Sequence, residues 1–337
     1  MTRTEAIANF LSGAGWGSAA RTPLAGDASA RRYERLTRGG ETAVLMDAPP
    51  DQGQDVRPFR RIADHLSRLA LSPPQILAAD DSLGLLLIED LGDALFARIL
   101  AVDPGQEIPL YRAAVDVLLA LHRHPAPPEL PQFDTTELAA AIEPLTAWYL
   151  PAIGANAATA DGIEPLLRDA LQALAPADPV ICLRDYHAEN LIWLPSRKGA
   201  ARVGLLDFQD AFAGHPAYDL VSLLQDARRD VAPTAAAAAT DRYLRESGAD
   251  AEQFARACAT LGAQRNLRIL GIFARLSLRD GKAQYVDLIP RVWGHLQANL
   301  AHPGLAALAS CVAETVPVPT PDRLQRIKDR CATCPTR

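Results

Sequence analysis

The stretch Cys-Leu-Arg-Asp-Tyr-His-Ala-Glu-Asn-Leu-Ile-Trp-Leu (182–194) decides the fold of this chain. Two apolar residues at 180–181 lead into it, which favours a short strand that enters a polar loop. Apolar residues at 191–194 and 203–206 then flank a polar turn at 196–200, and this is the pattern of a two-stranded hairpin. We expect the hairpin to return the chain to the loop that it left.

The loop and the hairpin carry three oxygen-bearing side chains. Asp185 and Asn190 lie on the loop, and Asp207 follows the second strand. Carboxylate and amide oxygens are hard ligands, which suit Mg²⁺ and its complexes with nucleotide phosphates. The interval Asp-x-x-x-x-Asn, followed by an Asp-Phe-Gly-like turn, is the pattern of kinases. Asp207-Phe208-Gln209 stands where that turn would be. We predict that Asp185 orients or deprotonates an acceptor hydroxyl, and that Asn190 and Asp207 hold Mg²⁺.

Each of these residues also has a purely structural interpretation. Asp and Asn in an extended loop often make only Asx-turns, and Asp207 could simply end a strand. The order of strand, loop, hairpin and second acid favours the catalytic interpretation, because several independent features then agree.

These motifs resemble the aminoglycoside phosphotransferase-like family of small-molecule kinases. Members of that family typically read His-Gly-Asp-x-x-x-x-Asn, whereas this chain reads Leu183-Arg184-Asp185. The difference keeps the reacting carboxylate and changes how the loop is braced. The resemblance implies an α/β (α+β), bilobal, protein-kinase-like fold with a small antiparallel-sheet lobe and a larger, mostly helical lobe. It also implies ATP and Mg²⁺ as cofactors.

A narrower resemblance is to the anomeric kinases of N-acetylmuramate and N-acetylglucosamine, and it runs from about residue 5 to about residue 300. The segments that carry it are residues 31–33, 46–50, 89–92, 207–211, 264–276 and 279–282. It implies transfer of the γ-phosphoryl group of ATP to the anomeric hydroxyl of an amino sugar, in cell-wall sugar recycling. An anomeric hydroxyl is more acidic than an ordinary alcohol, so Asp185 would need to do little beyond alignment.

Length and charge narrow the classes of protein. A chain of 337 residues exceeds one typical domain. We expect a nucleotide-binding lobe at 1–91, a catalytic and substrate-binding lobe at 92–305 and a C-terminal tail at 306–337. The net charge of -6 argues against a basic surface of the kind that binds nucleic acid. No apolar run reaches the roughly 18 to 20 residues that span a bilayer, and the N-terminus does not read as a signal peptide. We therefore expect a cytoplasmic enzyme with a small-molecule substrate.

The small lobe is expected to hold the nucleotide. Residues 25–36 predict a strand, a small-residue turn over the phosphates and a second strand. The third predicted strand ends in Met46 and Asp47, at the place where a kinase carries its phosphate-pairing Lys. We hypothesise that Arg31 or Arg32 supplies the missing positive charge, although solvated arginines on a surface hairpin are the alternative.

The connection between the lobes is predicted at Glu89-Asp90-Leu91-Gly92, after an amphipathic helix at 57–71. Adenine is usually held there by backbone groups, and Glu89 and Leu91 are the residues that we predict for it. The alternative is that Glu89 and Asp90 are ordinary solvated acids.

Residues predicted to bind the acceptor lie on both sides of the hairpin. His187 is predicted to touch substrate or phosphate, and Asp210 either grips sugar hydroxyls or caps the turn. Arg265 and Arg268 share one side of a helix predicted at 251–275, where they could recognise the lactyl carboxylate of N-acetylmuramate. A solvated helix face with ion pairs is the alternative for these arginines.

Two further predictions concern support and the C-terminus. Asp219, in the first turn of a predicted helix, is assigned a structural role behind the catalytic loop, because a carboxylate there can accept backbone N–H groups. A zinc site at Cys331-Ala332-Thr333-Cys334 would need two further ligands, which Cys311 or His302 could contribute if the tail folds back. We favour the other interpretation, a frayed tail.

Two other functions remain open. The same core could phosphorylate another hydroxylated acceptor of the aminoglycoside, choline or homoserine type. Alternatively, the missing small-lobe Lys could mark a nucleotide-binding pseudokinase.

Overall fold

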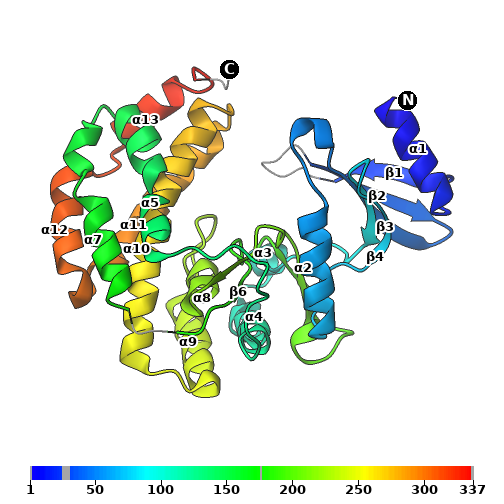
Figure 1. Ribbon diagram of the computed structural model, residues 1–337, viewed down its shortest axis with the longest axis horizontal. Helices are drawn as coiled ribbons and strands as arrows, with labels where there is room; N and C mark the ends of the chain where they lie inside the picture. Colours follow the sequence, from blue (N-terminus) through cyan, green and yellow to red (C-terminus); the bar gives the residue numbers. More distant parts are fainter. Residues whose placement is uncertain (1, 25–30, 175–176, 335–337) are drawn as a thin grey trace. The chain divides into compact units, whose positions relative to one another are not determined.

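The computed structural model describes residues 2–24, 31–174 and 177–334. The chain forms two compact units (Figure 1). Unit 1 comprises Met1–Leu121 and Ala188–Ala211, and unit 2 comprises His122–His187 and Phe212–Arg337. These bounds differ from the predicted division after residues 91 and 305, because unit 1 also includes two helices and the hairpin from further along the chain.

Unit 1 contains a five-stranded antiparallel sheet in the order β1-β2-β3-β5-β4. Its strands are β1 (Ala20–Pro23), β2 (Arg32–Arg38), β3 (Glu41–Asp47), β4 (Ile76–Asp80) and β5 (Leu85–Glu89). The helix α1 (Arg3–Gly13) buries Ile7 and Leu11 against Leu36 and Leu45 of the sheet. Successive side chains of a strand point to opposite faces. Residues of β2 and β3 that share the parity of Leu36 and Leu45 therefore lie on the face that α1 covers.

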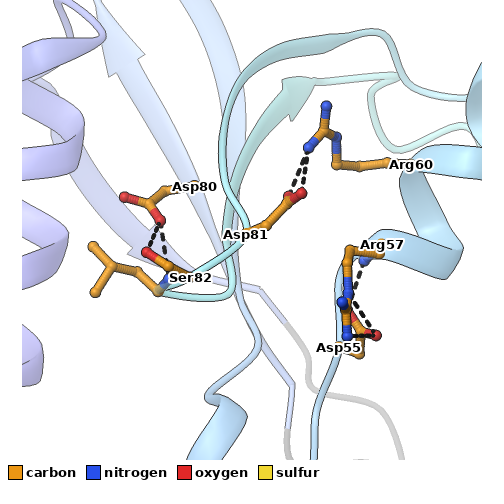
Figure 2. A network of polar contacts seen from close by, with 7 residues as sticks. Asp55, Arg57, Arg60, Asp80, Asp81 and Ser82 are labelled. Carbon is orange, nitrogen blue, oxygen red and sulfur yellow. Dashed lines mark hydrogen bonds and ion pairs between the residues drawn. The ribbon is translucent and has the colours of Figure 1, made fainter.

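Polar and aromatic contacts hold the helix α2 (Arg57–Arg68) within unit 1. Arg60 Nη1 donates to both carboxylate oxygens of Asp81, at 2.7 and 2.6 Å, in the turn between β4 and β5 (Figure 2). A second pair, Arg57 with Asp55, closes the start of the helix (Figure 2). On the apolar side of α2, the ring of Phe59 stacks on Phe208 with the ring centroids 4.8 Å apart.

The hairpin of β7 (Leu191–Trp193) and β8 (Val203–Leu205) belongs to unit 1, together with α3 (Phe96–Val102) and α4 (Glu107–Leu121). Two backbone hydrogen bonds attach it: Trp193 N to Ala94 O at 2.8 Å and Leu205 N to Ser72 O at 2.9 Å. These bonds join segments far apart in the sequence. Local patterns therefore did not reveal that the hairpin and the sheet form one unit.

Unit 2 is mostly helical. Its elements are α5 (Thr135–Ala140), α6 (Leu150–Ala152), α7 (Ile163–Gln172), β6 (Val180–Cys182), β9 (Phe212–Gly214), α8 (Ala217–Leu224), α9 (Pro233–Ser247), α10 (Ala251–Leu278), α11 (Ile289–Leu300), α12 (Ala306–Thr315) and α13 (Pro321–Asp329). Helix α10 is the centre of this unit, because its residues are largely buried and it packs on α8 and α11. At Gly271 a side chain would meet the backbone of Pro144 at 2.0 Å, so only glycine allows this close approach.

The frayed tail predicted for the C-terminus is wrong for the residues described there. Helix α13 buries Ile327 completely, and the backbone N–H groups of Ala332 and Cys334 donate to the end of α10, to Ser277 O and Leu278 O, each at 3.0 Å. Cys331 and Cys334 are free thiols. Within the described part of the chain, no helix combines the length and the apolar character needed to cross a membrane.

Candidate active site

The loop after β6 contains a tight turn. Asp185 N donates to Leu183 O at 2.9 Å, and Arg184, between them, has a φ of 72°. A bond from residue i+2 to residue i around a positive φ is the mark of the classic γ-turn, which is rare and strained. Such strain persists only where the surrounding structure over-determines the conformation. The turn ends at Asp185, the aspartate predicted to orient or deprotonate the acceptor hydroxyl.

Asp219 of α8 holds two of the backbone groups in this turn. Its carboxylate accepts hydrogen bonds from Leu183 N at 2.6 Å and from Arg184 N at 2.9 Å. The side chain is fully buried, and burial raises the pKa of Asp219 to about 7, against these N–H groups and Arg265, which lower it. Asp219, which the sequence analysis assigned a structural role, therefore contacts the backbone of the turn directly.

Ser222, one helical turn after Asp219, holds the carbonyl of the same turn. Its hydroxyl donates to Arg184 O at 3.1 Å, and it accepts from Arg265 Nη2 at 2.9 Å. Arg265 also donates to Gln225 O at 3.4 Å, and only 8% of the residue is exposed. The guanidinium predicted to meet the sugar is therefore used within the contact between α8 and α10. Sequence analysis missed Ser222; its signal is the spacing from Asp219, which puts both on one helix face.

Arg268, three residues further along α10, has a different environment. Burial lowers the pKa of Arg268, nearby Arg184 adds to that effect, and Tyr218 and Asp185 oppose it. Among the residues that the structure describes, none forms a hydrogen bond or an ion pair with Arg268. A half-buried guanidinium near Asp185 that lacks a described anionic partner is suited to bind an anion.

His187 is almost entirely buried, at 4% exposure. Arg228 Nη1 donates to its Nε2 at 3.2 Å, which assigns the proton to Nδ1. Burial lowers the pKa of His187 well below its ordinary value, and Arg228 and Arg265 act in the same direction. The imidazole is therefore neutral.

Unit 1 carries the two predicted metal ligands. The pairing of Leu191 with Leu205 places Asn190 beside Leu206, whose N–H donates to Asn190 O at 3.0 Å. Asp207 comes next, with a φ of 55°, and its Oδ1 accepts from Gln209 Nε2 at 2.7 Å. The hairpin thus brings Asn190 and Asp207 to the same end. Their amide and carboxylate oxygens are donors of the kind that Mg²⁺ prefers.

The phosphate-binding turn predicted at 25–30 lies outside the described residues. Arg31 directly precedes β2, and Arg32 is its first, exposed residue. Arg32 shares the strand parity of Leu36, so it belongs to the face covered by α1. Asp47, which stands near the expected Lys position, is 6% exposed and accepts from Arg3 Nε of α1 at 2.9 Å. It anchors α1 to the sheet.

The segment after β5 is held by ion pairs. Glu89 accepts from Arg197 Nη2 at 2.5 Å and from Gln75 N at 3.2 Å. Asp90 accepts from Arg35 Nη2 at 3.0 Å, and its side chain is 7% exposed. The interpretation of Glu89 and Asp90 as ordinary solvated acids is therefore wrong. Two other residues in the predicted set remain: Leu91 is buried, and Asp210 is exposed.

Comparison with known proteins identifies the family. A model of the phosphotransferase enzyme family matches residues 20–258. Several relatives carry the name N-acetylmuramate/N-acetylglucosamine kinase. The one from Caulobacter vibrioides is 43% identical over 94% of this chain and 98% of its own, and the one from Pseudomonas aeruginosa is 35% identical over 89% and 90%.

The fold also has a solved counterpart. The structure of a microcompartment-associated aminopropanol kinase matches with a TM-score of 0.64 at 15% identity, over 90% of this chain and 99% of that one. The predicted mixed α/β kinase-like fold, with an antiparallel sheet and a helical part, is confirmed. The chain therefore belongs to the phosphotransferase enzyme family and is a small-molecule kinase.

Proposed function

We propose that this protein is an ATP-dependent sugar kinase that transfers the γ-phosphoryl group to the anomeric hydroxyl of N-acetylmuramate and/or N-acetylglucosamine. The names of the two relatives, which match along nearly the whole chain, support this choice of acceptor. The observation that supports the chemistry is the hairpin register, which brings Asn190 and Asp207 to the same end of the hairpin. Use of ATP supports action in the cytoplasm.

The proposed roles follow from the chemistry of each group. Asp185 accepts a hydrogen bond from the acceptor hydroxyl, aligns it and takes its proton as the new bond forms. Asn190 and Asp207 would hold Mg²⁺, which when bound offsets the negative charge of the phosphates. Arg31 supplies a positive charge to the phosphates, in place of the absent Lys.

The nucleotide base is assigned to the segment after β5. We propose that backbone groups at Glu89 and Leu91 hold the adenine, because the side chain of Glu89 is already bonded to Arg197. This ion pair fixes the path of the segment and leaves its main chain to recognise the base.

The acceptor is assigned to residues near the catalytic turn. We propose that Arg268 binds the lactyl carboxylate of N-acetylmuramate, since a guanidinium matches a carboxylate with two parallel hydrogen bonds. The neutral His187 and the exposed Asp210 are proposed to contact sugar hydroxyls or phosphate.

The test is a transfer assay. Purified protein is incubated with ATP, Mg²⁺ and each of N-acetylmuramate, N-acetylglucosamine, an aminoglycoside, choline and homoserine, and ³¹P and ¹³C NMR locate the phosphate. We expect a sugar 1-phosphate, and none with Asp185→Ala. Phosphate on a different hydroxyl, or transfer only to another acceptor, would refute the anomeric assignment. ATP binding without any transfer would favour a pseudokinase.

A further inference from the structure

A row of polar contacts connects the middle of α10 to the strained turn in front of Asp185. Arg265 Nη2 donates to Ser222 Oγ at 2.9 Å, and Ser222 Oγ donates to Arg184 O at 3.1 Å. Every group in this row belongs to unit 2. Ser222 is completely buried and Arg265 is 8% exposed, so water does not compete freely for these hydrogen bonds.

Further hydrogen bonds support the start of the row, at Arg265. Next to Arg265, Asn266 Nδ2 donates to Gln225 Oε1 at 2.7 Å, and Asn299 of α11 donates to the same oxygen at 2.9 Å. Gln225 Nε2 in turn donates to Asn299 Oδ1 at 2.9 Å. These bonds tie α10 and α11 to the end of α8, next to the contact between Arg265 and Ser222.

The last hydrogen bond of the row reaches the strained turn at Arg184. Asp219 binds the two N–H groups around Arg184, and Ser222 binds its carbonyl oxygen. The positive φ of Arg184 is strained for a residue with a side chain. That conformation sets the direction in which the next residue, Asp185, leaves the turn.

We propose that Ser222 and Arg265 are positioning residues, which lock the peptide carbonyl of Arg184 and thereby aim the carboxylate of Asp185. Arg265 acts through Ser222 and does not touch the acceptor. This inference rests on the proposed function, because it assigns the aimed carboxylate to phosphoryl transfer.

The kinetic test uses Ser222→Ala, Arg265→Met and the double variant. A misplacement of about 1 Å can cost roughly a hundredfold in rate, so we expect kcat to fall on the order of ten- to a hundredfold in each single variant. The KM values for ATP and for both sugars should change less than about threefold. Because one residue acts through the other, the double variant should lose about as much as one single variant.

Two further variants serve as controls. Arg265→Lys keeps the charge and reaches Ser222 with a single donor, so it should recover part of kcat relative to Arg265→Met. Arg275→Met removes another arginine from α10, one whose charged neighbours are Arg279, Asp280 and Glu143, and should leave kcat unchanged. Additive losses, or a loss confined to the KM of a sugar, would overturn the proposal and return Arg265 to the acceptor.

A second measurement does not depend on sugar phosphorylation. Hydrogen exchange followed by mass spectrometry reports the amides of Leu183, Arg184 and Asp185 directly. We expect them to exchange at least about tenfold faster in Ser222→Ala and Arg265→Met than in wild type or Arg275→Met. Unchanged exchange in both variants would overturn the proposal that Ser222 and Arg265 hold the turn. If wild type phosphorylates neither sugar, the proposed function fails, and the exchange result still decides whether the turn is held in this way.

Discussion

Asp47 lies at the end of β3, where a kinase carries its phosphate-pairing Lys, and its carboxylate accepts a hydrogen bond from Arg3 of α1. Sequence analysis noted that this strand carries no Lys, but it could not assign a partner to Asp47. The partner of Asp47 lies 44 residues away in the sequence. Strand parity now also separates the two arginines proposed as substitutes, because Arg32 belongs to the face that α1 covers.

Arg31→Ala should therefore weaken ATP binding more than Arg32→Ala does. Loss of one charge-assisted contact to phosphate costs about 1.5–3 kcal/mol, so we expect the KM for ATP to rise at least about tenfold in Arg31→Ala. Steady-state kinetics at saturating sugar measures this. A larger rise in Arg32→Ala, or no rise in either variant, would contradict the assignment.

His122 should make stability depend on pH. Burial lowers the pKa of His122 to about 4, and the ring nitrogen Nδ1 is 2.8 Å from the hydroxyl of Tyr243. Between these two pKa values, His122 is protonated in the unfolded chain, where its pKa is the ordinary 6.5, and neutral in the folded protein. Stability is therefore lost as the pH falls from about 6.5 towards about 4, by up to about 3 kcal/mol.

Urea unfolding at pH 7 and pH 5 measures this loss. His122→Gln removes the titrating group and should reduce the difference between the two pH values. His187 and His215 have pKa values that are lowered in the same direction, so part of the dependence will remain. An identical pH dependence in wild type and His122→Gln would contradict the prediction.

At the scale of elements, the helix predicted at 57–71 and the hairpin at 191–206 are present, as α2 and as β7 with β8. Their periodicities are local, and each element forms where its own residues indicate. Their contact is not local: Phe59 of α2 stacks on Phe208, directly after Asp207. This stack couples the position of α2 to the turn that carries a proposed metal ligand.

Phe59→Ala should therefore affect both stability and metal dependence. Removal of a buried aromatic ring costs about 3–5 kcal/mol, and the freed Phe208 no longer holds its neighbour in place. We expect a lower urea midpoint and a higher Mg²⁺ concentration for half-maximal activity. Phe59→Leu, which keeps most of the apolar volume, is the matched control and should show a smaller change in both. A destabilised variant with unchanged Mg²⁺ dependence would show that the Phe59–Phe208 stack does not position the metal site.

At the scale of the whole molecule, the proposed roles divide between the two units. Residues proposed for nucleotide and metal lie in unit 1: Arg31, Glu89, Leu91, Asn190 and Asp207. Asp185, His187 and Arg268, proposed for catalysis and acceptor binding, lie in unit 2, whereas Asp210, also proposed for the acceptor, lies in unit 1. The chain passes from unit 2 to unit 1 directly after His187, within the stretch that decides the fold.

Variants in the two units should consequently produce different kinetic defects. Asn190→Ala should raise the Mg²⁺ requirement with either sugar. Arg268→Met should raise the KM for N-acetylmuramate about ten- to a hundredfold, by loss of a charge-assisted contact, and leave that for N-acetylglucosamine nearly unchanged, because only the former carries a carboxylate. Each sugar is thus the control for the other. Equal effects of Arg268→Met on both sugars would remove the carboxylate assignment.

The sequence by itself determined the features that depend on neighbours along the chain. The interval between Asp185 and Asn190, the hairpin and the turn at Asp207 follow from local patterns, and the register of a short hairpin is set by its own turn and alternation. The family and the kinase-like fold class could be inferred from these motifs.

Only the tertiary structure decided which distant groups meet. It paired Asp47 with Arg3, directed Arg265 to Ser222 and placed the hairpin with the sheet. The physical reason is that helical periodicity shows which face of α10 is polar, but not whether a guanidinium on that face meets solvent, a substrate or another helix. That outcome depends on how α8 and α10 pack, and packing is a property of segments that the sequence keeps far apart.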